Sequence, residues 1–448
     1  MRKIVFICLL LMLIVKISTA QESEREVNDV LSINIDLAIE MALEQNPLIR
    51  ISKLGVESSE AQYYETLGNL LPSINASGAY NRNLKRPVIF MPDEAPFFGQ
   101  VLEIGSEHSY NAGISGRIPI YNHALYSNMK ANKIQKHLSE EELRAAKIDL
   151  EYNVKMAFYN TLLAKESFEI MDQRFVNAQA NLEKIQSMYK QGMVSEFDLI
   201  RAEVQTENLK PSLLQSENAY KRSLNYLKVL TGIENSKNVE LQGSLVQLSE
   251  EVLPEYSLEK PNESIANNTD LVQLDIRTNL IEQQAKAIKA SNLPSLTAIG
   301  NYQFQSQAND YNFSDYEWVQ TSAIGLQLNI PVFNGLTTRN RAKQLLIASK
   351  QLSLQKNYLE ENLNVQLEDN HRTIALAIEK AANAESNIKL AKKAYNIALK
   401  RYNTGQGTLL EVNDSEISLA QAQFNLIQAI HEILAAKTDH EKFLGENK

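Results

Sequence analysis

The sequence predicts a mainly α-helical protein with some β-structure, in which one structural unit occurs twice. Both copies contain Leu-Pro-Ser before an alternating apolar and polar stretch, and Ile-Pro followed by one residue, an aromatic and Asn after a second stretch. About seventy helix-like residues without proline follow in each copy. Pro119, Gly192 and Gly232 correspond to Pro331, Gly405 and Gly445 at offsets of 212, 213 and 213 residues. These nearly constant offsets indicate a duplication of hairpin, long helix, tip and return helix.

Residues 1–20 are expected to form a secretory signal peptide. Arg2 and Lys3 precede an apolar run of 12 residues, and Ser18-Thr19-Ala20 provides a small-residue cleavage site. The run is too short to span a bilayer as a helix, although an uncleaved anchor is the alternative. The single cysteine, Cys8, lies in this segment. Loss of three basic residues with the signal would make the formal net charge of −9 more negative, which argues against a nucleic-acid partner.

The rest of the chain divides into seven expected segments according to periodicity and the positions of Pro, Gly, Asn and Ser. The stretch from Ile233 to Asn268 is expected to be either an irregular connector or a small subdomain in the middle of the body. The expected segments are N-terminal helices at 21–71, a first β-hairpin at 72–120, a first long-helix hairpin at 121–232, the connector at 233–268, a helix at 269–293, a second β-hairpin at 294–332 and a second long-helix hairpin at 333–448.

The two hairpin regions change to a period of two, which is typical of β-strands. Each alternation covers about ten residues, the length that a tilted strand needs to cross a bilayer. The only tryptophan and several tyrosines gather here, as they do in aromatic girdles. The apolar residues expected to share strand faces are Ile74, Ala76, Gly78 and Tyr80; Tyr110, Ala112, Ile114, Gly116 and Ile118; Leu296, Ala298, Gly300, Tyr302 and Phe304; and Trp318, Ile324, Leu326 and Leu328.

Two interpretations of these strands remain open. In the first, soluble hairpins pack on the helices. In the second, the strands enter a membrane, where unpaired backbone groups at a sheet edge cost several kcal/mol each. Four strands are too few to close a barrel, so the membrane interpretation requires several chains.

The long helices are expected at about 122–191 and 334–404, which corresponds to roughly 105 Å each at 1.5 Å per residue. In the second helix, mainly apolar and aromatic side chains recur every seven residues, with one step of eight between Leu359 and Leu367. A strict seven-residue repeat indicates a left-handed supercoil with neighbouring helices. The repeat positions are Leu345, Leu352, Leu359, Leu367, Ile374, Ala381, Ile388, Tyr395 and Tyr402.

Each long helix is expected to end at a glycine, and a capping box is expected to start the return helix. The two boxes are Ser195-Glu196-Phe197-Asp198 and Thr408-Leu409-Leu410-Glu411. Capping alone would explain Asp198 and Glu411, but it does not explain Asp414. Since Glu411 and Asp414 are three residues apart, they share a helix face, and a symmetric oligomer would stack them as acidic rings that favour cations.

The sequence contains no convincing catalytic or metal-binding motif. The six histidines are scattered, no His-Glu-x-x-His motif occurs, and no thiol lies outside the expected signal, so neither a metal site nor a cofactor site is expected. Ser-x-x-Lys recurs at unrelated positions, among them Ser127, Ser187, Ser353 and Ser386 in the expected helices, which indicates chance. Catalytic residues are therefore not expected.

The duplicated motifs resemble those of the TolC-like outer-membrane efflux and secretion channels over essentially the whole mature chain. The shared pattern is Leu-Pro-Ser before a strand, Ile-Pro-[Ile/Val]-[Tyr/Phe]-Asn after one, and Tyr-x-x-Gly-x-x-[Ser/Thr]-x-x-[Asp/Glu] at the tips. The resemblance implies a homotrimer whose antiparallel coiled-coil helices form an α-barrel through the periplasm. It also implies that four transmembrane strands per chain complete a 12-stranded β-barrel in outer-membrane lipid of a Gram-negative bacterium. The implied partners are a periplasmic adaptor of the membrane-fusion type and an inner-membrane pump of the RND, ABC or MFS type.

The resemblance also assigns roles to residues at the tips. Glu411 and Asp414 match pore-constricting acids, and Tyr402 and Asp198 match a tyrosine and an aspartate that link helices in the closed state. Gly407 departs from the arginine of the family's best-known member, which puts one closing link in doubt. By resemblance, the adaptor contacts are Gly192, Met193, Val194, Gly405, Gln406 and Gly407.

The sequence therefore predicts a passive, gated exit duct for efflux or type I secretion, driven by an energised partner. The alternative from another class is a periplasmic coiled-coil scaffold or adaptor that never enters a membrane. The sequence does not reveal the transported substrate or the class of pump.

Overall fold

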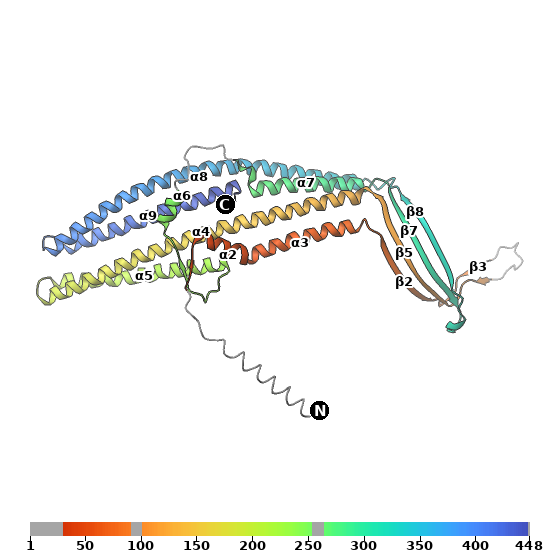
Figure 1. Ribbon diagram of the computed structural model, residues 1–448, viewed down its shortest axis with the longest axis horizontal. Coiled ribbons are helices and arrows are strands. Elements are labelled where there is room, and N and C mark those ends of the chain that lie inside the picture. Colours follow the sequence, from red (N-terminus) through yellow and green to blue (C-terminus); the bar gives the residue numbers. More distant parts are fainter. Residues whose placement is uncertain (1–29, 91–100, 253–263, 447–448) are drawn as a thin grey trace, which may run out of the picture. The chain divides into compact units, whose positions relative to one another are not determined.

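A computed structural model describes residues 30–90, 101–252 and 264–446, with only the backbone described at 101 and 102. The expected signal peptide at 1–20 lies outside these residues. The first copy contains β1 (Leu31–Ile33), α2 (Ile35–Gln45), α3 (Pro47–Gly68), β2 (Ser73–Arg82), β3 (Val88–Phe90), β4 (Val101–Glu103), β5 (His108–Asn122), α4 (His123–Lys190) and α5 (Glu196–Thr231) (Figure 1). There follow β6 (Val239–Leu241), α6 (Leu245–Val252), η2 (Ile265–Asn267), α7 (Thr269–Ala290), β7 (Ser295–Ala308), η3 (Phe313–Asp315), β8 (Val319–Asn329), α8 (Thr337–Asn403) and α9 (Leu409–Leu444).

The bounds of the elements confirm the duplicated, mainly helical fold. Helices α3 and α7 each have 22 residues, α4 and α8 have 68 and 67, and α5 and α9 each have 36. Gly232 and Gly445 end the two return helices in the left-handed conformation, with φ of 73° and 69°. None of the helices in the described part of the chain combines the length and the hydrophobicity needed to span a bilayer.

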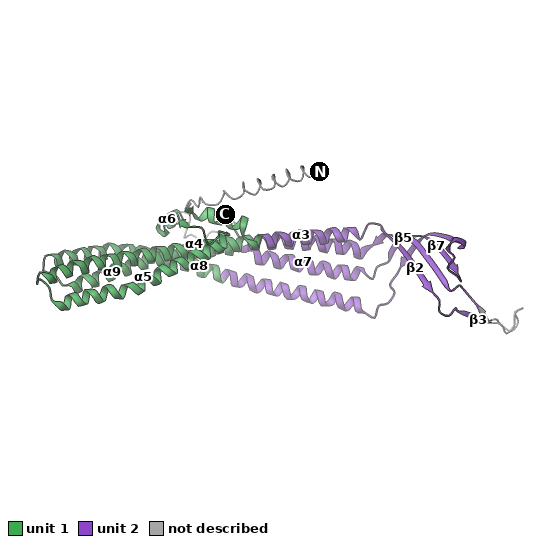
Figure 2. Ribbon diagram, turned by 90° about the horizontal axis from the view of Figure 1, so that it is seen from below, with its two compact units in different colours: residues 1–49, 147–264, 365–448 green, residues 50–146, 265–364 purple. Residues whose placement is uncertain are grey.

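The chain folds into two compact units, which Figure 2 shows in different colours. The first unit comprises 1–49, 147–264 and 365–448, and the second comprises 50–146 and 265–364. Helices α4 and α8 contribute residues to both units.

The first unit contains most of the large, fully buried side chains among the described residues, including Phe158, Leu162, Leu227 and Ile433. Its small helices pack on the long ones, α2 against α5 and α6 against α9. The connector also forms structure, because β6 pairs in parallel with β1. The described part of this stretch contains the strand β6, the helix α6 and the short helix η2.

The second unit contains a four-stranded antiparallel sheet with the order β2-β5-β7-β8. Directly opposite residues share a face, so the register can be compared with the expected faces. Ile74 faces Gly116, Ile114 faces Tyr302, and Gly300 faces Ile324. The four expected apolar sets therefore join into one apolar face across all four strands.

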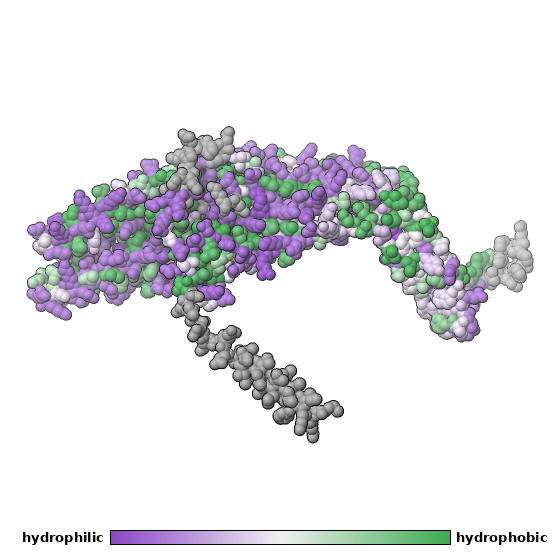
Figure 3. All heavy atoms as spheres, in the orientation of Figure 1, coloured by the Kyte–Doolittle hydropathy of each residue, from purple (hydrophilic) through white to green (hydrophobic). Residues whose placement is uncertain are grey.

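This apolar face is uncovered in the single chain. Ile324 is 95% exposed, and Ile74, Leu326 and Leu328 are also exposed. The space-filling view shows hydrophobic residues gathered over the strands near their junction with the helices (Figure 3). The opposite face contains Asn75, Arg117, Asn301 and Gln327, which are among the residues that border a hollow of about 360 Å³.

The strands and loops differ from the expectation in four places. Strand β5 continues past Pro119 to Asn122, and its register with β7 shifts between Pro119 and Tyr121. The pairing of β2 with β5 stops at Ser73 opposite Arg117, so Pro119, which has no backbone N–H, lies beyond the part of β5 that pairs with β2. Trp318, expected inside the last strand, lies just before it. Within the single hairpin expected at 72–120, the chain forms a second, short hairpin, β3–β4. Helix α8 begins at Thr337 and not at 334, because Gly335 and Leu336 have φ of 64° and 63°.

Candidate functional site

The first tip is a tight turn between α4 and α5. Gly192 has φ of 72°, its N–H donates to the carbonyl of Tyr189 at 2.8 Å, and the N–H of Met193 donates to the carbonyl of Met188 at 2.9 Å. Ser195 then caps α5 in a complete capping box with Asp198. The Asp198 carboxylate accepts from the Ser195 hydroxyl at 2.6 Å and from the Ser195 N–H at 3.3 Å. This turn reverses the chain without long loops.

The second tip repeats the turn but not the complete box. Gly405 has φ of 74°, and its N–H donates to the carbonyl of Tyr402 at 3.0 Å. Thr408 caps α9 by accepting from the N–H of Glu411 at 3.3 Å. The Glu411 carboxylate does not return to the Thr408 N–H but lies 3.8 Å from the Arg401 guanidinium. The expectation of a full capping box at 408–411 was therefore wrong, because Arg401 competes for this carboxylate.

Glu411 and Asp414 are both exposed in the first turns of α9, while Val412 and Asn413 between them are buried. Among the described residues, Glu411 has Arg401 as its cation, whereas no residue forms an ion pair with Asp414. Both acids thus present their charge on the same side of α9.

Tyr402 and Asp198 lie near each other but do not form a hydrogen bond. The ring of Tyr402 packs on an apolar cluster of Ile185, Ala202 and Leu409. Its hydroxyl is buried without a hydrogen-bond partner among the described residues, and the Asp198 carboxylate is held by Ser195. Burial raises the pKa of Tyr402, and the charge of Asp198 raises it further.

The first tip exposes several apolar side chains. Met193 is 67% exposed, but Val194 packs inward on the cluster around Ile185. Phe197 and Ile200 in the first turns of α5 are exposed instead. Phe197 lies between Ser195 and Asp198 of the capping box, a motif that indicates a helix start and gives no signal for a contact residue.

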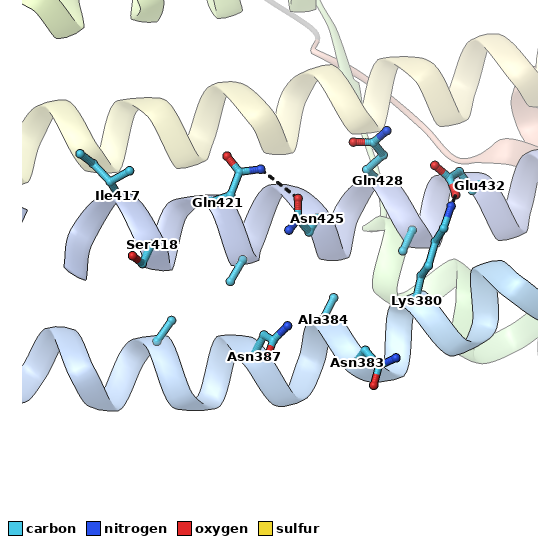
Figure 4. Close-up of a pocket in the computed structure, with 13 residues that line it drawn as sticks. Lys380, Asn383, Ala384, Asn387, Ile417, Ser418, Gln421, Asn425, Gln428 and Glu432 are labelled. Carbon is cyan, nitrogen blue, oxygen red and sulfur yellow. Dashed lines mark hydrogen bonds and ion pairs between the residues drawn. The ribbon is translucent and has the colours of Figure 1, made fainter. Parts of the chain in front are cut away.

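A groove of about 840 Å³, lined by amide side chains and by several alanines, runs between α8 and α9 (Figure 4). Its wall on α9 includes Ser418, Gln421, Asn425 and Gln428, and its wall on α8 includes Asn383 and Asn387. The Gln421 amide donates to Asn425 at 2.9 Å, and Lys380 pairs with Glu432 at 2.8 Å.

The α9 residues of this groove share a helix face with Asp414. At 100° per residue, positions 4, 7, 11 and 14 beyond Asp414 return to within about 40° of it. The sequence spacing alone could have identified this polar stripe, because charged and amide residues recur there at helical intervals.

A buried carboxylate, Glu416 of α9, lies near the half-buried Arg174 of α4 without a direct ion pair among the described residues. Glu416 is 4% exposed, and it lines a cavity of about 510 Å³ together with Arg174, Asn177 and Tyr395. One Glu416 carboxylate oxygen and the Arg174 Nε lack hydrogen-bond partners among the described residues. Burial raises the pKa of Glu416, while Asn177 and Arg174 oppose the rise. Burial also raises the pKa of Tyr395, and the negative charge of Glu416 raises it further.

The described residues contain no group of three or more His, Cys, Asp or Glu side chains arranged to hold a metal ion.

Comparison with known proteins gives consistent similarities. A model of the family named "outer membrane efflux protein" matches residues 38–233 and 261–446. The chain is 23% identical over 381 residues to outer membrane protein TolC of Vibrio cholerae serotype O1, covering 84% of this chain and 82% of that protein. It is 24% identical over 405 residues to the probable outer membrane lipoprotein SilC of Salmonella typhimurium, covering 86% and 80%. The crystal structure of the Campylobacter jejuni CmeC outer membrane channel matches with a TM-score of 0.73 at 17% identity, covering 95% of this chain and 90% of that chain.

We predict that Glu416→Gln flattens the dependence of stability on pH. Since the native state raises the pKa of Glu416, it binds this proton more tightly than the unfolded state does. This contribution to stability is present at low pH and is lost as the pH rises through the raised pKa. Between pH 5 and pH 8 the melting temperature of the unmodified protein should therefore fall by about 1–3 °C more than that of the variant. Glu203→Gln, at an exposed position on α5, is the control, and parallel curves for Glu416→Gln and the unmodified protein would contradict the assignment.

Proposed function

The chain belongs to the outer membrane efflux protein family, and on this basis we propose how it assembles, conducts solutes and closes. It is an exit channel of the outer membrane of a Gram-negative bacterium and serves efflux or secretion systems. The family is a transport family and not an enzyme family. The side chains at the tips are therefore interpreted as walls, contacts and a gate.

The assembly we propose is a homotrimer in which β2 of one chain pairs with β8 of the next. The uncovered apolar face of the sheet is the observation that carries this proposal, because it continues across all four strands. The edge strands β2 and β8 have no outer partner in the described part of the chain, and lipid cannot satisfy their backbone groups. Twelve strands in a closed barrel would satisfy every edge and place the apolar face toward lipid.

The proposed gate consists of Glu411 and Asp414 at the second tip. Three copies would place these exposed acids around the axis, where like charges repel one another and attract cations. The α9 face that carries Asp414 continues into the amide-lined groove, so the same assignment makes the groove part of the lumen wall. Neutral amides suit a passage that must not retain its cargo.

Tyr402 and Asp198 are the proposed closed-state link between the two helical hairpins. The buried hydroxyl of Tyr402 lacks a partner, so a turn of Asp198 away from Ser195 would give it one. Since Gly407 carries no side chain, this link acts without an arginine at that position.

The tips are the proposed contact with a periplasmic adaptor, through Gly192, Met193 and Val194 at one and Gly405, Gln406 and Gly407 at the other. Met193 supplies an exposed apolar side chain, and the inward packing of Val194 fixes the turn that presents it. An inner-membrane pump of the RND, ABC or MFS type would supply the energy, because the channel is passive.

The first prediction concerns the membrane face. Ile324→Arg places a charge on the apolar face, whereas Gln327→Arg places the same charge on the opposite face of the same strand. A charge facing lipid near the bilayer midplane costs about 2–4 kcal/mol, so Ile324→Arg should reduce the amount of heat-resistant trimer in the outer membrane and Gln327→Arg should not. Membrane fractionation and electrophoresis without boiling measure both. Equal behaviour, or recovery of the unmodified protein in the soluble periplasmic fraction, would favour the scaffold alternative.

The second prediction concerns the gate. Glu411→Ala combined with Asp414→Ala should raise single-channel conductance in planar bilayers and weaken block by the trivalent cation spermidine, at least several-fold. The physical reason is the loss of fixed negative charge at the narrowest part of the passage. Glu361→Ala removes one exposed acid from α8 as a control. If spermidine blocks the double variant as strongly as the unmodified channel, the two acids are not part of the gate.

The third prediction concerns the groove. Asn425→Cys introduces a thiol into a chain whose only cysteine is Cys8, in the expected signal. Reaction with a cationic thiol reagent should lower the conductance of the variant, because the added group would project into the lumen. The unsubstituted chain treated in the same way is the control. If the thiol reacts and the conductance stays the same, the groove lies outside the passage.

A further inference from the structure

We propose that Arg401 is a specificity-determining residue of the gate, because it masks the charge of Glu411 and leaves Asp414 as the main cation-attracting acid. This inference rests on the proposed gate function. Arg401 lies in the last turn of α8, one residue before Tyr402.

The side chain and backbone of Arg401 are both held by the second tip. Its Nη2 donates to the carbonyl of Gln406 at 3.1 Å. Its own carbonyl accepts from the N–H groups of Gln406 and Gly407 at 2.9 and 3.1 Å. The guanidinium is thus anchored across the turn, and its Nη1 lies 3.8 Å from the Glu411 carboxylate.

Gly407 provides the space for this arrangement. A Cβ atom at 407 would lie 3.0 Å from the Cβ of Arg401, 3.0 Å from the carboxylate of Glu411 and 3.1 Å from the backbone nitrogen of Tyr402. Even the first carbon of a side chain would therefore crowd both members of the ion pair. Gly407 thus leaves the space in which an arginine six residues earlier reaches Glu411.

The capping pattern supports the same assignment. At the first tip, Asp198 completes the capping box, and its carboxylate accepts a hydrogen bond from the Ser195 hydroxyl. At the second tip, the Glu411 carboxylate leaves the box open and faces Arg401. Asp414, one turn farther along α9, has no ion-pair partner among the described residues, so its charge is unmasked.

The masking is partial, because the side chains of Arg401 and Glu411 are 53% and 43% exposed. Exposed ion pairs contribute little energy and weaken with salt. The expected effect on cation block is therefore about two- to five-fold, and it should shrink at high ionic strength.

The test is spermidine block of single channels in planar bilayers, measured for Arg401→Gln, Glu411→Gln, the double variant and Asp414→Asn. Arg401→Gln should lower the half-blocking spermidine concentration about two- to five-fold, because it unmasks Glu411. In the Glu411→Gln background the same change should have less than half of this effect on a logarithmic scale. Arg401→Lys should retain the masking in part, and Arg339→Gln, an exposed arginine at the other end of α8, should leave block unchanged.

The outcomes separate this inference from the gate itself. If Arg401→Gln has the same effect with and without Glu411, Arg401 acts as an independent charge and the masking is refuted. If Asp414→Asn weakens block but Arg401→Gln does nothing, the gate stands and only the present inference falls. If Asp414→Asn also leaves spermidine block unchanged, the proposed gate itself is refuted, and with it the inference that rests on it.

Discussion

The antiparallel pairing of β5 with β7 is the interaction on which the sheet depends. It joins the last strand of the first copy to the first strand of the second copy, from His108 opposite Ala308 to Asn122 opposite Ser295. A shift of one residue would turn every apolar side chain of one copy to the polar face of the other. The observed register keeps the two apolar sets together, and it leaves β2 and β8 as the free edges.

Free edges and an uncovered apolar face describe a chain that is incomplete by itself. In water, such a face would promote aggregation, and in lipid the edges would carry unsatisfied backbone groups. Pairing of the edges between copies removes both problems at once. The same duplication that supplies two hairpins per chain therefore also makes the oligomer a requirement of the membrane part.

The two tips show how a duplicated unit acquires different roles. Both tips use a glycine with positive φ and a hydroxyl cap, so the turns are alike. They differ in the acid at the third helical position, which completes the cap in one copy and meets Arg401 in the other. The first tip presents Met193 and Phe197, and the second presents Glu411 and Asp414.

Much of the fold could be predicted from the sequence because its signals are local. Periodicity identified the strands and the long helices, and the glycines marked the helix ends within a few residues. The deviations occur where the surrounding backbone determines the structure. At Pro119, β5 has passed the part that pairs with β2, and the backbone conformation of Gly335 and Leu336 delays the start of α8. Glu411 and Asp414 could be placed on one helix face from their spacing alone.

The sequence by itself determined the duplication, the alternating faces of the strands and the shared face of the two acids, because each follows from residue spacing along one element. The tertiary structure alone decided that Val194 packs inward, that the Glu416 carboxylate is buried, and that Arg401 meets Glu411. These contacts join residues that lie on different helices or on opposite sides of a turn. Side-chain direction and the space left by Gly407 select them, and no periodic pattern encodes either one.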